Sequence, residues 1–267
     1  MTSHAANFAR LHQGPDLLVL PNAWDAGSAR IIEHAGAKAI ATSSAAVAWA
    51  HGFPDGEALA PEQLLATIRA IARVVSIPVT ADIEAAYTSD GAATGAFAAR
   101  VIDAGAVGVN IEDGSAPPDL LCTKIGALRE TAAKKDVDLW INARVDVYLR
   151  RLAEGEAAFT ESVARAKRYT AAGANSIFVP GVADKTLIGN LVRGISLPLN
   201  VLAWPGLPDA ATLKSLGVRR LSAGSGLAKA CLSHTHALTT EFLATGRSEL
   251  FAQGPLAQVN LNTLMKK

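Results

Sequence analysis

The chain contains few of the residues that mark several common classes of protein. Its two cysteines, Cys122 and Cys231, are too few for a disulfide framework or a cysteine-rich zinc site. Lys plus Arg number 25 and Asp plus Glu number 24, with no long basic run, so the charge pattern does not favour a surface for nucleic acid or anionic membrane. Aromatic residues make up only 5% of the chain. We therefore expect a core of Ala, Val, Leu and Ile, which suits the layered aliphatic packing inside a barrel.

Long apolar runs are also missing. None approaches the roughly 20 residues that a membrane-spanning helix needs, and the first 20 residues lack a basic segment followed by a long apolar one, the pattern of a secretory signal. We expect a soluble, cytoplasmic protein with no membrane partner. The length of 267 residues suits one domain over residues 1–267, because (β/α)8 barrels commonly run to about 250 residues as a single domain.

Short apolar runs alternate with Ala-rich helical stretches along the whole chain. Eight runs are predicted strands, and their nearly continuous apolar character is typical of parallel strands buried on both faces. They are Leu17–Trp24, Lys38–Ser44, Pro78–Glu84, Val107–Asp113, Leu139–Asp146, Ser176–Val182, Leu197–Trp204 and Arg219–Ser225. The helices predicted between them include Ala26–Ala35, Pro61–Val75, Gly91–Ala104 and Glu156–Ala172.

A short motif recurs at the joints. AGAKAI (35–40), AGAVGV (104–109) and AGANSI (172–177) each close a helix and open a strand, and LGVRRL (216–221) is a looser copy. The glycine fits the left-handed position that ends a helix. Eight such units without a linker favour a closed (β/α)8 TIM barrel. The alternative is a doubly wound open sheet, which the lack of a GxGxxG motif after the first strand weakens.

Polar residues gather where the predicted strands end, at the edge where such barrels place their sites. Asp82 and Glu84 end the third strand and are expected to point to the same side, since strand side chains alternate. The fourth strand adds Glu112 and Asp113, of which only one should face inward. Converging carboxylates repel one another unless a cation lies between them, and oxygen ligands favour Mg²⁺, with Mn²⁺ possible. The alternative is that Asp82, Glu84 and Glu112 form structural ion pairs.

Further candidates follow the second and fifth strands. Arg144 is suited to bidentate binding of a substrate carboxylate, whereas Asp146 is either part of the site or structural. The loop AWAHGFPDGEAL is expected to bring Asp55 into the site, while His51 is expected to be a surface or packing residue. No pattern near either cysteine would activate a thiolate. The apolar stretch 227–243 is either the last barrel helix or a helix that packs on another subunit.

The segments TSSAAVAWAHGFPDG, ADIEAAY, VNIEDG, INARVDVYL and GANSIFVPG, in this order and spacing, resemble the isocitrate lyase and phosphoenolpyruvate mutase superfamily. The likeness covers nearly the whole chain. It implies a TIM barrel of that type, often with the C-terminal helix swapped between subunits, and hence a homo-oligomer, either a dimer or a tetramer.

The resemblance also implies a metal site. Asp82 corresponds to the residue that binds Mg²⁺ directly, and Glu84 and Glu112 correspond to carboxylates that hold metal-bound water. Glu84 departs from the family pattern, which usually has a second Asp there, followed by a Gly that is Ala86 in this chain. The charge is kept, but the side chain is longer by one methylene.

A substrate site is implied in the same way. Asp55 corresponds to the catalytic Asp near the reacting group, and Arg144 to the Arg that binds substrate. Ser43 and Ser44 correspond to the segment whose amides and hydroxyl hold the substrate carboxylate. Asn22, in the segment PNAWDAG, is also expected to bind substrate.

Two departures narrow the expected reaction. The lyase branch carries a Lys-Lys/Arg-Cys-Gly-His motif after the fourth strand, but this chain has DGSAPPDLLCTKIG there, so cleavage with a Cys acid is not expected. The longer gating loop of the mutase and phosphonopyruvate hydrolase branch is also missing. The chain looks like the short-loop members, which are often labelled carboxyvinyl-carboxyphosphonate phosphorylmutase.

We therefore expect a Mg²⁺-dependent lyase, decarboxylase or hydrolase that acts on a small 2-oxo or 2-hydroxy carboxylic acid through an enolate-like intermediate, with C–C cleavage favoured. One alternative is a phosphonopyruvate-type P–C bond mutase or hydrolase. Another is a non-catalytic barrel that binds a metal or a ligand.

Overall fold

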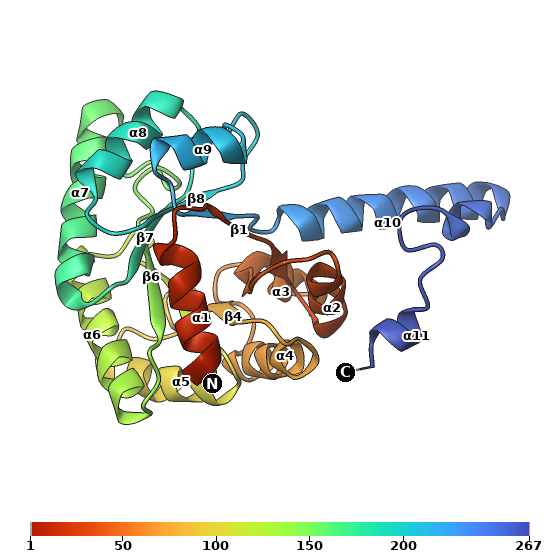
Figure 1. The fold of residues 1–267 in the computed structure, drawn as a ribbon, viewed down its shortest axis with the longest axis horizontal. Coiled ribbons are helices and arrows are strands. Elements are labelled where there is room, and N and C mark those ends of the chain that lie inside the picture. Colours follow the sequence, from red (N-terminus) through yellow and green to blue (C-terminus); the bar gives the residue numbers. More distant parts are fainter. Residues whose placement is uncertain (1, 267) are drawn as a thin grey trace.

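The computed structural model describes residues 2–266 and shows a ring of parallel strands with helices around it (Figure 1). The strands pair in the order β1-β9-β8-β7-β6-β5-β4-β3-β2, with every pair parallel. They are β1 (Leu18–Leu20), β2 (Asn22–Ala23), β3 (Ile40–Thr42), β4 (Val79–Asp82), β5 (Gly108–Glu112), β6 (Trp140–Arg144), β7 (Ser176–Val179), β8 (Leu199–Leu202) and β9 (Arg220–Ser222). The predicted TIM barrel is confirmed.

The first predicted strand consists of two short strands on either side of Pro21. The β1 segment pairs with β9, whereas β2 pairs with β3, so this one stretch of chain closes the ring. Pro21 has no N–H to donate to either neighbour, although its carbonyl accepts from the Ala41 amide at 3.1 Å. The nine strands therefore correspond to the eight predicted ones.

The helices begin and end on recognisable signals. Asp25, Asp90, Asp184 and Asp209 each precede a helix and accept a hydrogen bond from a backbone amide of its first turn. The main helices are α1 (Thr2–Gln13), α2 (Ala26–His34), α3 (Ser44–Ala50), α4 (Pro61–Val74), α5 (Gly91–Asp103), α6 (Pro118–Lys134), α7 (Gly155–Ala172), α8 (Lys185–Gly194), α9 (Ala210–Leu216) and α10 (Gly226–Thr245), followed by a 3-10 helix (Glu249–Ala252) and α11 (Leu261–Leu264).

The repeated glycine behaves as expected at the helix ends. Gly105 and Gly173 follow α5 and α7 with φ angles of 106° and 110°, in the left-handed region that disfavours other residues. The core between sheet and helices is mainly aliphatic, as predicted.

Helix α1 covers the N-terminal ends of the strands, which the sequence patterns did not predict. Phe8 and His12 of this helix lie against Trp140, the first residue of β6, and Phe8 belongs to a cluster with Leu18 and Val107, which also lie at strand starts. The bottom of the barrel is therefore closed, and the opposite end is open for a site.

His12 predicts a pH dependence of stability. Burial, reinforced by the Arg220 guanidinium, lowers its pKa from 6.5 to about 3, so the folded protein keeps this ring neutral while the unfolded chain protonates it below pH 6.5. The free energy of unfolding should fall as the pH drops from 6.5 toward 3, by about 2 kcal/mol at pH 5 relative to pH 7. Urea unfolding of wild type and His12→Phe at both pH values measures this. Equal losses in the two proteins would refute it.

Helix α10 leaves the barrel and projects away from it (Figure 1). Ala228 is its one buried residue, whereas Leu232 and Leu243 are 55% and 80% exposed. Within residues 2–266, no helix is both long enough and apolar enough to cross a bilayer.

Candidate active site

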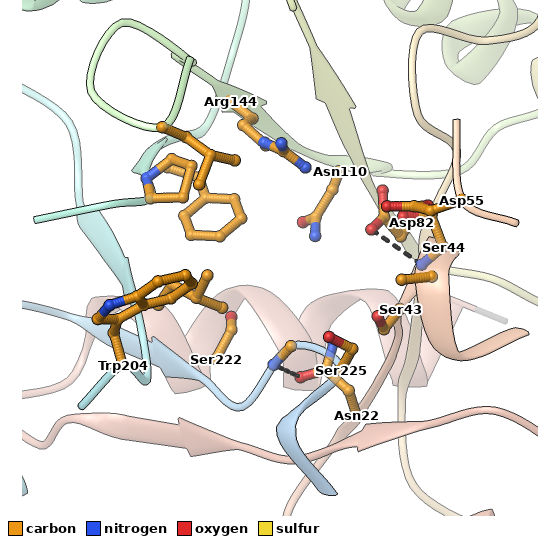
Figure 2. A pocket seen from close by; sticks show the side chains of 16 residues that line it. Asn22, Ser43, Ser44, Asp55, Asp82, Asn110, Arg144, Trp204, Ser222 and Ser225 are labelled. Carbon is orange, nitrogen blue, oxygen red and sulfur yellow. Dashed lines mark hydrogen bonds between the residues drawn. The ribbon is translucent and has the colours of Figure 1, made fainter. Parts of the chain in front are cut away.

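A cavity of about 250 Å³ opens at the C-terminal ends of the strands (Figure 2). Asp82, Arg144, Leu202 and Ser222, the last residues of four different strands, contribute to its wall. The lining residues are Asn22, Ser43, Ser44, Ala45, Asp55, Asp82, Asn110, Arg144, Leu149, Phe178, Pro180, Leu202, Trp204, Ser222, Gly224 and Ser225. Asp55 and Asp82 lie on one side of the cavity, opposite Trp204 (Figure 2).

Asp82 is the carboxylate that β4 presents to this cavity. Its Oδ2 accepts from the Ser44 amide at 3.2 Å, and its Oδ1 accepts from the Glu84 amide at 3.3 Å. Burial raises the pKa of Asp82, while Arg144 across the cavity opposes that rise. Asp82 is therefore a partly buried carboxylate whose ionised form a nearby cation would stabilise.

Glu84 lies differently from the expectation drawn from strand alternation. The strand β4 ends at Asp82, and Glu84 has a φ of 51°, so the two-residue period no longer applies to it. Its carboxylate accepts from the Glu57 amide at 2.6 Å and from the Tyr87 hydroxyl at 3.1 Å, and Glu84 does not line the cavity. Burial, together with the nearby Asp82, raises its pKa to about 7. Glu84 therefore lies next to Asp82 but outside the cavity lining.

Glu112 holds the arginine of the site. Glu112 Oε2 lies 2.6 Å from Arg144 Nη1, and Asp146 Oδ1 accepts from Arg144 Nε at 2.7 Å. The exposed Arg150 also contacts both carboxylates. Burial raises the pKa of Glu112, while the Arg144 guanidinium opposes the rise. Arg144 is thereby fixed by two carboxylates and lines the cavity, 6.0 Å from the centre of the Phe178 ring.

Of the adjacent pair at the end of β5, Asp113 faces away from the cavity, as expected for one of the two. Its Oδ2 accepts from Tyr169 at 2.6 Å and from Arg165 at 2.9 Å, both on α7, and its Oδ1 accepts from the Asp146 amide. Asp113 therefore anchors α7 to the sheet. Asp146 is fully buried and does not line the cavity, and its carboxylate accepts from Arg144 Nε.

The remaining predicted site residues all line the cavity, but several are already bonded. Asp55 is exposed in the loop after α3. Ser43 caps α3, and the Ser44 amide is occupied by Asp82. Asn22 donates to the Thr42 carbonyl at 2.7 Å and accepts from the Gly224 amide at 2.9 Å. Its side chain thus ties β2, β3 and the loop after β9 together.

Several lining residues escaped the sequence analysis. Asn110 and Ser222 line the cavity, and so does Trp204 (Figure 2). Phe178 and Leu202 also line it, and with Trp204 they are called the apolar wall below. The sequence pattern could have identified Asn110, because it is a polar residue inside the apolar run of β5. The apolar wall carried no such signal, because apolar residues at strand ends look like ordinary core.

The carboxylates in and around the cavity suit a hard cation with few protein ligands. Within the described residues, no three His, Cys, Asp or Glu side chains are grouped as direct metal ligands. Mg²⁺, however, commonly keeps several waters and takes one or two carboxylates from the protein. Asp82 and Asp55 both line the cavity. Glu84 and Glu112 do not line it, but both are close enough to Asp82 for its charge to raise their pKa values. This donor set fits Mg²⁺ at Asp82.

Cys122 and His51, which the sequence did not place in the site, do not line the cavity. Cys122 packs on α6 against the core and does not line the cavity, and burial raises the pKa of its thiol. His51 Nε2 lies 2.9 Å from the Thr67 hydroxyl on α4, consistent with the packing role expected for it.

Comparisons with known proteins place the chain in a family. The family model described as phosphoenolpyruvate phosphomutase matches residues 8–243. The chain is 30% identical over 254 residues to an oxaloacetate decarboxylase of Pseudomonas fluorescens (strain SBW25), covering 88% of this chain and 84% of the relative. A crystal structure of a provisionally assigned phosphonomutase from Burkholderia cenocepacia J2315 is 37% identical, with a TM-score of 0.86 over 89% of this chain and 99% of that one.

The fold also matches a phosphonopyruvate hydrolase crystallised with oxalate and Mg²⁺, at 22% identity and a TM-score of 0.86, over 98% of this chain and 95% of that one. The similar proteins thus include one named as an oxaloacetate decarboxylase and one provisionally assigned as a phosphonomutase. The match to residues 8–243 covers most of the sequence, the barrel is shared, and the chain therefore belongs to the phosphoenolpyruvate phosphomutase family.

Proposed function

We propose that this protein is a Mg²⁺-dependent enzyme that cleaves a C–C bond in a small 2-oxo or 2-hydroxy carboxylic acid through an enolate-like intermediate. The observation that carries the proposal is the pairing of Asp82 with the doubly anchored Arg144 around one cavity of about 250 Å³. The similarity to an oxaloacetate decarboxylase supports the C–C reaction, and the oxalate and Mg²⁺ in the hydrolase structure support the ligand class.

In this proposal the carboxylates serve the metal and the proton transfer, and Arg144 serves the substrate. Mg²⁺, when bound, supplies a Lewis acid that polarises substrate oxygens. Asp82 would hold it, with Glu84 and Glu112 orienting its water ligands. Arg144, fixed on two sides, binds a substrate carboxylate and stabilises negative charge that develops as the bond breaks. Asp55, the exposed carboxylate at the rim, is suited to moving a proton to or from the reacting carbon.

The second candidate is P–C bond chemistry, which the 37% identical structure assigned as a phosphonomutase supports. The apolar wall of Phe178, Leu202 and Trp204 favours the first candidate, because it suits an alkyl substituent on the substrate better than a phosphonate. Trp204 is 53% exposed, so the wall remains partly open to water.

A substrate panel with and without Mg²⁺ tests the proposal. The panel contains oxaloacetate, its 2- and 3-substituted relatives, 2-methylisocitrate and phosphonopyruvate, with release of pyruvate and phosphate as readouts. We expect metal-dependent cleavage of a carboxylic substrate. Phosphate release would move the protein to the second candidate, and silence across the panel despite Mg²⁺ binding would support a binding protein instead.

Cys122→Ser is expected to keep at least about half of the wild-type kcat/KM. The thiol packs against the core outside the cavity, and burial disfavours its thiolate form. Steady-state kinetics on the substrate found in the panel measures the effect. A loss of more than tenfold at unchanged thermal stability would assign Cys122 a catalytic role after all.

We also propose a homo-oligomer in which α10 packs on a second copy of the chain. Its support is the projecting helix with Leu232 and Leu243 exposed, together with the helix exchange that the sequence resemblance implies. Light scattering should give a dimer or tetramer mass, and Leu232→Glu with Leu243→Glu should lower it. A monomer mass for the wild type at about 10 μM would refute this.

A further inference from the structure

Hydrogen bonds inside the barrel decide which way the Asn110 amide faces. Asn110 lines the cavity from β5 (Figure 2), and its Oδ1 accepts from two buried side chains. Asn142 Nδ2 donates to it at 2.9 Å, and Arg220 Nη2 donates at 3.1 Å. Because both partners are donors, the Asn110 atom that they contact must be its oxygen.

One arm of this network begins at Trp140. The indole Nε1 donates to Ser176 Oγ at 2.8 Å, and an indole N–H can only donate. The Ser176 hydroxyl is then free to donate to Asn142 Oδ1, at 2.7 Å. Asn142 therefore turns its Nδ2 toward Asn110, in agreement with the contact above.

The other arm is Arg220, which is completely buried. Its Nε donates to Ser222 Oγ at 3.0 Å, and Ser222 Oγ donates to Asn200 Oδ1 at 3.1 Å, so the guanidinium is held in place. A guanidinium has no acceptor. A flipped Asn110 would direct its NH2 at Arg220, donor against donor. Both arms thus leave the Asn110 NH2 directed away from them, toward the cavity.

We propose that Asn110 is a specificity-determining residue, and that Arg220 positions it so that its NH2 donates to a carboxylate or keto oxygen of the ligand. The inference rests on the proposed function and adds to it a fixed donor that selects an acceptor-bearing ligand. A hydrogen bond to a charged oxygen changes affinity by about 10- to 100-fold. Freeing the amide to flip would place an acceptor against that oxygen.

Calorimetric titration of oxalate in the presence of Mg²⁺ tests the proposal in a double-mutant cycle. Asn110→Ala should weaken oxalate binding about 10-fold or more. Arg220→Met should weaken it about threefold to tenfold in the wild-type background and less than twofold in the Asn110→Ala background, because Arg220 acts through Asn110. Thr80→Val, a buried change on β4 outside the cavity, is the matched control and should stay within twofold.

The outcomes separate the claims. An Arg220→Met loss of equal size in both backgrounds would show that Arg220 acts by its charge, which overturns its positioning role. Unchanged binding in Asn110→Ala would overturn the whole inference while leaving the proposed function intact. A wild-type protein that binds no oxalate would count against the proposed function itself, and the inference would fall with it. If Arg220→Met does not fold, Ser176→Ala breaks the other arm of the network in the same cycle. It should also weaken oxalate binding in the wild-type background and change it less than twofold in the Asn110→Ala background.

Discussion

Asp82→Asn should reduce Mg²⁺-dependent kcat/KM by about 10³-fold or more, with little change in stability. We expect this loss because a bound metal would supply several kcal/mol of transition-state stabilisation, and Asp82 is a partly buried carboxylate that lines the cavity. Since burial raises its pKa, the ionised group costs free energy in the metal-free fold, and the amide removes that cost. Thermal unfolding with and without Mg²⁺ is the measurement: wild type should gain stability from the metal and the variant should not.

Asp113→Asn is the matched control on the neighbouring strand. This carboxylate is also buried, but it accepts from Arg165 and Tyr169 on α7 and faces away from the cavity. Its loss should cost about 3 kcal/mol of unfolding free energy and leave the stabilisation by Mg²⁺ in place. The reverse pattern, a folding defect in Asp82→Asn with retained metal binding, would make Asp82 a member of a structural ion-pair network.

Arg144→Lys should lower kcat/KM by about 10²- to 10³-fold, mostly through a higher KM. The guanidinium contacts Glu112 and Asp146 through different nitrogens while it lines the cavity. An ammonium is a single point charge and cannot keep both contacts and still meet a ligand carboxylate in a bidentate way. Steady-state kinetics with the substrate identified in the panel measures the change.

Arg150→Lys controls for charge in the same place. Arg150 contacts the same two carboxylates from an exposed position and does not line the cavity. Its replacement should change kcat/KM by less than about threefold, because exposed ion pairs contribute little. A small change in both variants, less than about threefold, would mean that the arginines only neutralise Glu112 and Asp146, because lysine keeps the positive charge.

The positions of the strands follow largely from the local pattern of apolar residues. The apolar runs located the strands to within a few residues, because burial on both faces demands continuous apolar sequence. Alternation correctly separated Glu112 from Asp113, since β5 runs regularly to its last residue. The same argument failed for Glu84, because β4 stops two residues earlier and the chain turns.

Other features depend on contacts between distant segments. The closing of the barrel bottom by α1 needs a helix at the start of the chain to meet β6, and nothing in the local sequence of α1 states that. The direction of Glu84 is set by the Glu57 amide of a separate loop.

The sequence by itself determined the repeating strand–helix architecture and the strand ends from which Asp82, Glu112 and Arg144 project. It did so because the periods of burial and the glycine at helix ends are local properties. Only the tertiary structure decided how these groups are used: that Glu112 and Asp146 hold Arg144, and that Asn110 is bonded to Arg220. Residues 110 positions apart in the chain meet there because closure of the barrel brings β5 and β9 around one interior, and that meeting has no signature in either strand alone.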